Sequence, residues 1–213
     1  YLITGCAGFI GSNLVKNLHK NYELILVDDL SEGVKTNLPK TLRKKLIKEK
    51  IQNIKNLKIT KIDGIFHLAS QASVPFSLKN FYKSSTNNLA SSIKVLELSK
   101  KYSAPIVYAS SSAVYGNLPL GNDEINKFLI SSPYAQDKLT IEHYAKISFE
   151  IFKTPSVGLR LFNVYGIRSE RSEITNNIMD VGSNACHSAC DHYAIWNMGV
   201  GSIVDHNSIT SRY

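Results

Sequence analysis

Three glycines spaced three residues apart constrain the fold of this chain more than any other feature. Gly5, Gly8 and Gly11 follow a short apolar run and precede an amphipathic segment. Glycines in this position allow a tight turn, let a phosphate approach the backbone, and let a helix pack closely on a strand. The pattern therefore predicts a strand, a turn and a helix that together bind a pyrophosphate, with Phe9 and Ile10 in the same site.

Short β-rich runs alternate with longer amphipathic runs up to residue 161. The pattern predicts strands near residues 1–4, 23–27, 46–48, 63–67, 105–109 and 156–161, and helices near residues 10–20, 34–45, 79–102 and 134–152. This alternation is typical of a parallel sheet that is joined by right-handed crossovers and covered by helices on both faces. We therefore predict an α/β fold built on a doubly wound parallel sheet.

An acidic pair ends the second predicted strand. Asp28 stands 17 residues after Gly11, with Asp29 and Ser31 close behind it. This is near the offset of about 20 residues at which an acid accepts hydrogen bonds from the ribose of a dinucleotide. A carboxylate repels a 2′-phosphate, so the pair favours NAD over NADP. A turn or helix-capping acid is the alternative interpretation of Asp28.

A phenol and an ammonium are expected on one face of a helix. Tyr134 and Lys138 are four residues apart in a segment that begins after Pro133, and residues at this spacing share a side of a helix. The unperturbed pKa of tyrosine is about 10, so a tyrosine base working near neutrality needs a shift of about 3 units, which a nearby cation favours. An exposed helix surface is the alternative, because this spacing is common there.

A run of serines follows the apolar strand that ends at Ala109. Ser111 and Ser112 lie in this run, and hydroxyls at the carboxyl end of a parallel strand face the crevice where open sheets bind ligands. A serine there can hold a substrate hydroxyl in a short relay to a tyrosine. We therefore expect Ser111, Ser112, Tyr134 and Lys138 to act together in catalysis.

Taken in order, these motifs resemble those of the extended short-chain dehydrogenase/reductase family, in particular its NAD-dependent nucleotide-sugar epimerases and dehydratases. The matching motifs are Thr4-Gly5-x-x-Gly8-x-x-Gly11, Asp28, Asp63-x-x-Phe66-His67-Leu68-Ala69, Ser73-Val74-Pro75-x-Ser77, Asn88, Val114-Tyr115-Gly116, Tyr134-x-x-x-Lys138 and Leu159-Arg160-Leu161-Phe162-Asn163-Val164-Tyr165-Gly166. The resemblance covers about residues 1–168 and implies a Rossmann domain with NAD as its cofactor.

The resemblance also implies a role for each matched residue. Tyr134 would take the proton from a sugar hydroxyl, Lys138 would tune the phenol and bind the nicotinamide ribose, and Ser111 would be the catalytic hydroxyl. Further cofactor contacts are implied for Leu68, Ala69 and Asn88, and substrate contacts for Ser73, Ser111 and Asn163.

Two departures from the family pattern bear on the reaction. Sugar dehydratases of the family place an acidic pair after the catalytic serine or threonine, whereas this chain has Ser112 and Ala113. A UDP-sugar 4-epimerase that works through a transient 4-keto sugar is therefore favoured. A dehydratase, decarboxylase or reductase of the same family and an inactive NAD-binding module are the alternatives.

Where relatives have Gly-Asp-Ile, this chain has Glu49-Lys50-Ile51, so we expect weaker binding of adenine.

The charge is divided unevenly along the chain. The net charge is +8, but residues 1–168 carry +11 and residues 169–213 carry −3 and no lysine. In the basic stretch at residues 40–61 the lysines alternate with aliphatic side chains rather than with stacking aromatics, so we expect a solvated face and no binding of nucleic acid.

We predict an NAD-binding domain at residues 1–168 and an atypical tail at residues 169–213. The tail is not family-like, so the substrate domain is expected to be largely missing.

Cysteine content and hydropathy indicate where the chain works and with what. Three cysteines in 213 residues are too few for a disulfide framework, which favours a reducing cytoplasm. No run of about 18 apolar residues occurs, so no membrane span is expected. The tail lacks the ordered ligand pairs of a structural zinc site, so no metal is expected.

The expected partners are a nucleotide-sugar substrate and a second copy of the chain, because relatives pair through the helices that correspond to residues 79–102 and 134–152.

Overall fold

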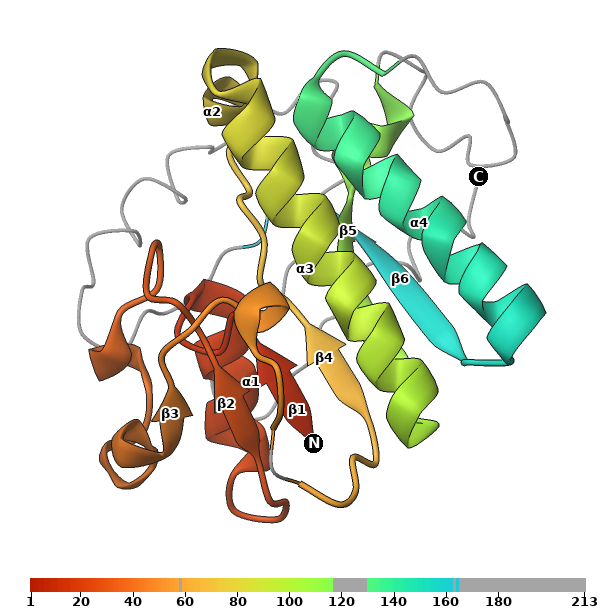
Figure 1. Ribbon diagram of the computed structural model, residues 1–213. Coiled ribbons are helices and arrows are strands. Elements are labelled where there is room, and N and C mark those ends of the chain that lie inside the picture. The colour runs from red at the N-terminus through yellow and green to blue at the C-terminus, as the bar shows by residue number, and fades with distance from the viewer. Residues whose placement is uncertain (58, 117–129, 163, 165–213) are drawn as a thin grey trace, which may run out of the picture.

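A parallel sheet of six strands forms the centre of the computed structural model, which describes residues 1–57, 59–116, 130–162 and 164. The strands are β1 (Leu2–Thr4), β2 (Ile25–Val27), β3 (Leu46–Ile47), β4 (Ile65–His67), β5 (Ile106–Ser111) and β6 (Ser156–Leu161). Every neighbouring pair is parallel, and the order is β3-β2-β1-β4-β5-β6 (Figure 1). The predicted α/β class and all six predicted strands are confirmed.

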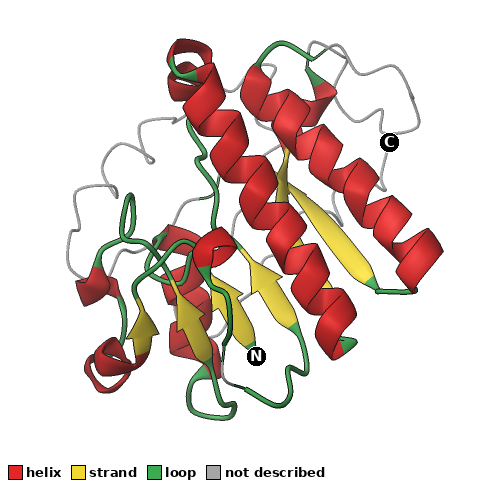
Figure 2. Cartoon of the chain, in the orientation of Figure 1, coloured by secondary structure: helices red, strands yellow, loops and turns green. Residues whose placement is uncertain are grey.

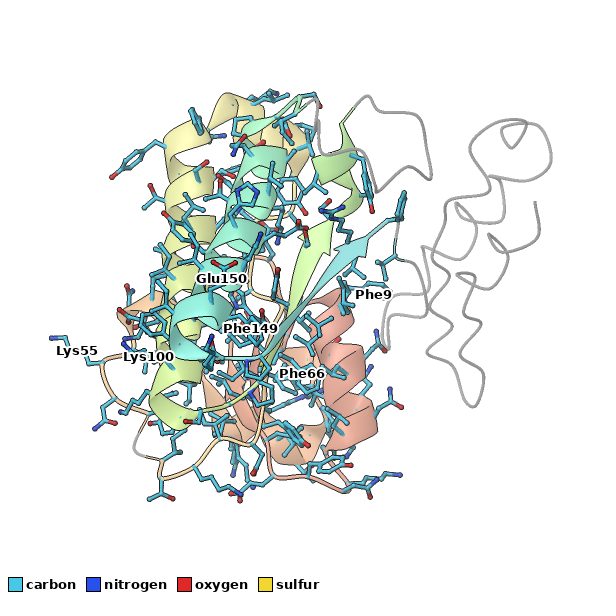
Figure 3. All side chains as sticks on the ribbon, turned by 90° about the vertical axis from the view of Figure 1, so that its right-hand side faces the viewer. Phe9, Lys55, Phe66, Lys100, Phe149 and Glu150 are labelled. Atoms are coloured by element: carbon cyan, nitrogen blue, oxygen red, sulfur yellow. The ribbon has the colours of Figure 1, made fainter. Side chains whose placement is uncertain are left out.

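Helices lie on both faces of the sheet (Figure 2). On one face α3 (Phe81–Tyr102) and α4 (Pro133–Phe152) lie side by side, with the short α2 (Val74–Lys79) before α3, and α1 (Phe9–Leu18) lies on the other face. In Figure 3 the sheet is seen between α1 and the pair formed by α3 and α4. This is the doubly wound arrangement that the sequence predicts. No helix within the described residues is long and apolar enough to cross a membrane.

Alternating side chains of the strands build one core on each face. Successive residues of a strand point to opposite faces, so Leu2 packs into the core under α3 and α4 while Ile3 packs into the core under α1. Val95 of α3 contributes to the first core and Val15 of α1 to the second. The burial of these apolar side chains holds the helices to the sheet.

The helix predicted at residues 34–45 is wrong. This segment forms two short 3-10 helices, Lys35–Asn37 and Lys40–Lys45, which are separated by Pro39. A proline disfavours helical backbone in the residue before it, and Leu38 accordingly has φ −80° and ψ 148°. As a result, β2 and β3 are connected through these two short 3-10 helices instead of a crossover α-helix.

The strand order places a topological switch point between β1 and β4. The chain proceeds from β1 outward to β3, then returns to β4 and proceeds to β6 on the other side. The connections after β1 and β4 therefore leave the sheet toward opposite faces, and a crevice opens between them at the carboxyl ends of the strands. The glycine turn follows β1 at this point.

Replacing Leu26 by alanine is expected to lower the free energy of unfolding by about 2–5 kcal/mol. Leu26 is fully buried in the core under α1, so the substitution removes apolar contacts and leaves a cavity. Urea denaturation measures the change. Leu78, which is 60% exposed, is the matched control, and Leu78→Ala should change the free energy by less than about 0.5 kcal/mol. Equal losses in both variants would contradict the assignment of the core.

Candidate active site

The turn between β1 and α1 requires glycine at two positions. Gly5 has φ +68°, and a Cβ there would lie 2.6 Å from the amide nitrogen of Ala69. A Cβ on Gly11 would overlap the carbonyl oxygen of Gly5. The turn therefore packs backbone against backbone. Gly8 is the N-cap of α1 and has no side chain to cap the helix. Gly8 and the first residues of α1 line the adjoining cavity. The positive end of the helix therefore faces this cavity, as a phosphate site requires.

The Asp28 carboxylate accepts a hydrogen bond at each oxygen. The amide of Ala7 donates to Oδ2 and the amide of Leu30 donates to Oδ1, both at 2.8 Å. Asp28 therefore holds the turns after β1 and β2 together, so the alternative interpretation of Asp28 as a turn acid describes part of its role. It also lines a cavity with Asp29 and Ser31, where a ribose is expected.

Two cavities open at the carboxyl ends of the strands. A cavity of about 280 Å³ lies over β2 and β1, and one of about 980 Å³ lies over β4, β5 and the first turns of α1 and α4. Both are lined by Gly5, Gly8, Leu68, Ser70 and Gln71. They are therefore two parts of one cleft that crosses the switch point. Folds whose strand order reverses in this way bind dinucleotides at this point.

Tyr134 and Ser111 meet in the larger cavity. Tyr134 lies in the first turn of α4, where its amide donates to Ser77 Oγ at 3.3 Å. Ser111 ends β5, and its Oγ accepts from the amide of Ala113 at 3.1 Å. Burial raises the pKa of Tyr134, and the bond with Ser111 opposes that shift. The phenol is therefore protonated at neutral pH.

Lys138 follows one helical turn later and is only 4% exposed. Its Nζ donates to the carbonyl oxygen of Ala109 at 2.7 Å and lies 5.7 Å from the centroid of the Tyr134 ring. Burial lowers the pKa of Lys138 to about 8, against the effect of Asp137. The sequence predicts that Lys138 lowers the pKa of Tyr134. The Lys138 ammonium lies near the Tyr134 ring, and its effect on the pKa of the phenol stays a prediction.

The cleft brings together most of the residues predicted from the sequence. The smaller cavity is lined by Gly5, Gly8, Asp28, Asp29, Ser31, Leu68 and Ala69, and the larger one by Phe9, Ile10, Gly11, Ser73, Ser111, Ser112, Tyr134 and Lys138. Asn88 lies outside both linings, is 1% exposed, and bonds to protein groups. Asn163 lies outside the described residues.

His67 takes part in a buried chain of hydrogen bonds beneath the cleft. Its Nδ1 lies 2.8 Å from Thr4 Oγ1 and its Nε2 lies 3.0 Å from Ser92 Oγ. Ser92 donates its hydrogen to the carbonyl of Asn88 at 2.8 Å, so His67 donates from Nε2 and accepts at Nδ1. Burial lowers the pKa of His67 to about 3. His67 is therefore neutral, and it holds β1, β4 and α3 in register.

A polar cluster beside the serine run was missed by the sequence reasoning. Arg160 of β6 donates to both carboxylate oxygens of Glu142 in α4, at 3.0 and 2.8 Å, and Ser110 Oγ also donates to Glu142. The Arg160 guanidinium lies 4.9 Å from the centroid of the Tyr115 ring. The spacing of Glu142 four residues after Lys138 is a signal that could have found it. Its pairing with Arg160 has no local signal.

Glu49 and Lys50 line the smaller cavity, where the adenine is expected. The Glu49 carboxylate is occupied by its own turn, since Oε1 accepts from the amide of Lys50 at 2.9 Å and from Asn53 Nδ2 at 3.0 Å. Glu49 therefore directs one carboxylate oxygen at its own turn, and Lys50 adds a positive charge beside it in the lining. Weaker binding of adenine stays a prediction.

A parallel sheet with this strand order, a glycine turn at its switch point and a cleft across that point define a dinucleotide-binding domain of the Rossmann class. The model of the NAD dependent epimerase/dehydratase family matches residues 1–200. The chain belongs to this family. The domain boundary predicted at residue 168 lies outside the described residues and stays a prediction.

Relatives agree with this assignment. A putative UDP-glucose 4-epimerase of Methanocaldococcus jannaschii is 37% identical over 182 residues, which cover 79% of this chain and 57% of that protein. A solved UDP-N-acetylglucosamine 4-epimerase from Methanobrevibacter ruminantium, in complex with UDP-N-acetylmuramic acid, has a TM-score of 0.73 and 38% identity over 78% of this chain and 56% of its own. The UDP-glucose 4-epimerase of Thermus thermophilus, in complex with NAD, has a TM-score of 0.69 and 30% identity over the same shares. The chain thus spans little more than half the length of these relatives.

The free energy of unfolding is expected to fall as the pH drops below about 6.5. An unfolded chain binds a proton at a histidine with a pKa of about 6.5, whereas His67 in the folded chain resists protonation down to about pH 3. The unfolded state therefore binds more protons in this window, and stability is lost by up to about 1.4 kcal/mol per pH unit. Urea denaturation at pH 7, 6 and 5 measures the slope. His67→Gln should flatten it, and an unchanged slope would refute this role of His67.

Proposed function

We propose that this chain carries the cofactor-binding and catalytic part of an NAD-dependent nucleotide-sugar 4-epimerase that acts on a UDP-sugar. The observation that carries the proposal is the meeting of Ser111, Tyr134 and Lys138 in a cavity continuous with the dinucleotide cleft. The epimerases among its relatives and the NAD in one of their structures support it. A cytoplasmic location stays a prediction from the low cysteine content.

The residues of the cleft fit NAD. The glycine turn and the amino terminus of α1 suit the pyrophosphate, because Gly5 and Gly8 line the cavity without a side chain and the positive end of the helix lies beside it. The carboxylates of Asp28 and Asp29 suit ribose hydroxyls and disfavour a 2′-phosphate. Lys138 at the far end would donate to the second ribose.

In the proposed reaction Tyr134 moves a proton at the sugar. When bound, NAD would accept a hydride from C4 of the sugar. Tyr134, oriented by Ser111, takes the proton of the C4 hydroxyl, so that the alcohol becomes a 4-keto sugar. Tyr134 would then give the proton back to the oxygen as C4 regains its hydride on the other face, which yields the epimer. The phenol has to lose its proton before the first step, and positive charge beside it favours that loss.

The lining of the larger cavity favours epimerisation over dehydration. Elimination of water needs an added acid and base beside the catalytic serine, and the residues there are Ser112 and Ala113. Neither side chain is a proton donor or acceptor of useful pKa at neutral pH. Epimerisation needs only Tyr134 as the group that accepts the proton and later returns it.

We also propose that two copies of the chain pair through α3 and α4. Apolar side chains are exposed on the outer layer that these helices form, namely Ile93, Tyr144, Ile147 and Ile151, which are 41–63% exposed. A group of exposed apolar side chains is typical of an interaction surface. Residues at positions 144, 147 and 151 share one face of α4, so they can pack together against a partner helix.

Tyr134→Phe is expected to retain NAD binding and to lose UDP-sugar interconversion by about 100-fold or more, because the phenol oxygen is the group that moves the proton. Fluorescence titration with NAD gives the Kd, and turnover of UDP-glucose and UDP-N-acetylglucosamine gives the rate. The control is Tyr144→Phe, on the exposed side of the same helix, which should match the unmodified chain in both assays.

The same two assays separate the alternatives. NAD binding without turnover by the unmodified chain would favour an inactive NAD-binding module, and a 4-keto-6-deoxy product would favour a dehydratase. Failure to bind NAD would overturn the proposal.

Ile147→Lys is expected to make the chain monomeric, because it buries an ammonium in an apolar contact. Sedimentation velocity measures the dimer fraction. Tyr22→Lys, an exposed position on the other side of the sheet, should leave the dimer intact. A monomeric unmodified chain would rule out this contact.

A further inference from the structure

Two adjacent residues of α4 bury opposite charges. Asp137 is 3% exposed and Lys138 is 4% exposed. Neighbouring helix residues point about 100° apart, and these two side chains reach different elements. Asp137 Oδ2 accepts from Asn88 Nδ2 of α3 at 3.3 Å, whereas Lys138 Nζ donates to Ala109 of β5. Buried charges of this kind are costly unless another charge or hydrogen bonds compensate them.

Asn88 uses its whole amide to connect α4 to the cofactor cleft. Its Oδ1 accepts from the amide of Gln71 at 2.8 Å and from Ser70 Oγ at 3.2 Å, and its Nδ2 donates to the carbonyl of Gln71 at 3.1 Å. Ser70 and Gln71 line both cavities. The bond from Asn88 to Asp137 therefore joins the turn after β4 to the helix that carries Tyr134 and Lys138.

The charges around Lys138 make Asp137 the group that opposes its loss of a proton. Burial lowers the pKa of Lys138 to about 8, and the negative charge of Asp137 raises it. His67 of β4 faces Lys138 and stays neutral, and the Tyr134 phenol is protonated. Glu142, one turn further along α4, is paired with Arg160. Asp137 is therefore the carboxylate whose charge raises the pKa of Lys138. Burial also raises the pKa of Asp137 itself, and its hydrogen bond with Asn88 opposes that rise.

We propose that Asp137 is a positioning residue for this site: its carboxylate, held by Asn88, keeps the buried Lys138 ammonium charged and ties α4 to the turn at residues 70–71. The role of Lys138 in the reaction rests on the proposed function. The charge state of Lys138 does not depend on the proposed function. The proposal about Asp137 and the proposed function can therefore fail separately.

The test is the titration of Lys138 by NMR of the lysine ε-methylene groups in the full chain, with its signal assigned by its absence in Lys138→Met. Asp137→Asn keeps an oxygen for Asn88 but removes the charge. It should lower the midpoint of the Lys138 titration by about one pH unit or more. Glu150→Gln removes the same charge from the exposed end of α4 (Figure 3), and it should leave the midpoint unchanged.

A second variant keeps the test decisive if Asp137→Asn fails to fold. Asp137→Ser is smaller and also removes the charge, while Asn88 Nδ2 keeps its bond to the carbonyl of Gln71, so it should lower the midpoint in the same way. A midpoint unchanged in a folded Asp137 variant, or lowered equally by Glu150→Gln, would overturn the proposal.

NAD titrations of the same variants supply a second readout. Asp137→Asn should bind NAD as the unmodified chain does at pH 6, where Lys138 is protonated in both proteins. At pH 8 it should bind several-fold more weakly, because there Lys138 keeps less of its charge in the variant than in the unmodified chain. A purely structural role would weaken binding equally at both pH values, and that result would also refute the proposal. Absence of NAD binding at any pH, with the NMR shift intact, would refute the proposed function alone.

Discussion

The close approach of two backbone turns is the constraint on which the cleft depends. The turn after β1 packs at Gly5 against the chain after β4 at Ala69, at a distance that leaves no room for a Cβ. These two turns leave the sheet at the point where the strand order reverses. Because no side chain intervenes there, the turns can lie together beneath a cleft that is continuous from β2 to α4. A dinucleotide needs this continuity, since its two halves lie on either side of the switch point.

Buried polar bonds, more than apolar contacts, set the walls of this cleft. Asp28 binds an amide on each oxygen, His67 bonds on both ring nitrogens, and the Asn88 amide is shared between the chain after β4 and α4. Leaving such a group without a partner costs about 1–3 kcal/mol in a protein interior. Each bond therefore fixes the distance between two elements, and together they hold the cleft in shape before a ligand binds.

The electrostatics of the catalytic end follow from burial. Withdrawal from water favours the neutral form of both Tyr134 and Lys138, raising the pKa of the phenol and lowering that of the ammonium. Hydrogen bonds and the charge of Asp137 work against this trend. The same pair of side chains on an exposed helix would titrate near ordinary values, so the chemistry of the pair depends on the sheet and on α3 as much as on α4 itself.

Local patterns in the sequence were sufficient to find the strands, the glycine turn and the pair Tyr134 and Lys138. Each depends on the spacing of residues within one element, and this spacing can be read directly from the sequence. A local rule also explains the failure at residues 34–45, where Pro39 interrupts an apolar pattern of helical period. The apolar periodicity alone predicts a helix there, and the proline prevents it.

Contacts between distant elements could not be found in this way. Nothing near Asn88 in the sequence indicates that its amide is divided between Gln71 and Asp137, and nothing near Glu142 indicates Arg160. The sequence by itself determined the fold class, and it predicted the phosphate site and the reacting side chains, because all of these depend on local spacing. Only the tertiary structure decided which groups are buried together and which charges balance, because burial and long-range pairing exist only once the sheet has assembled.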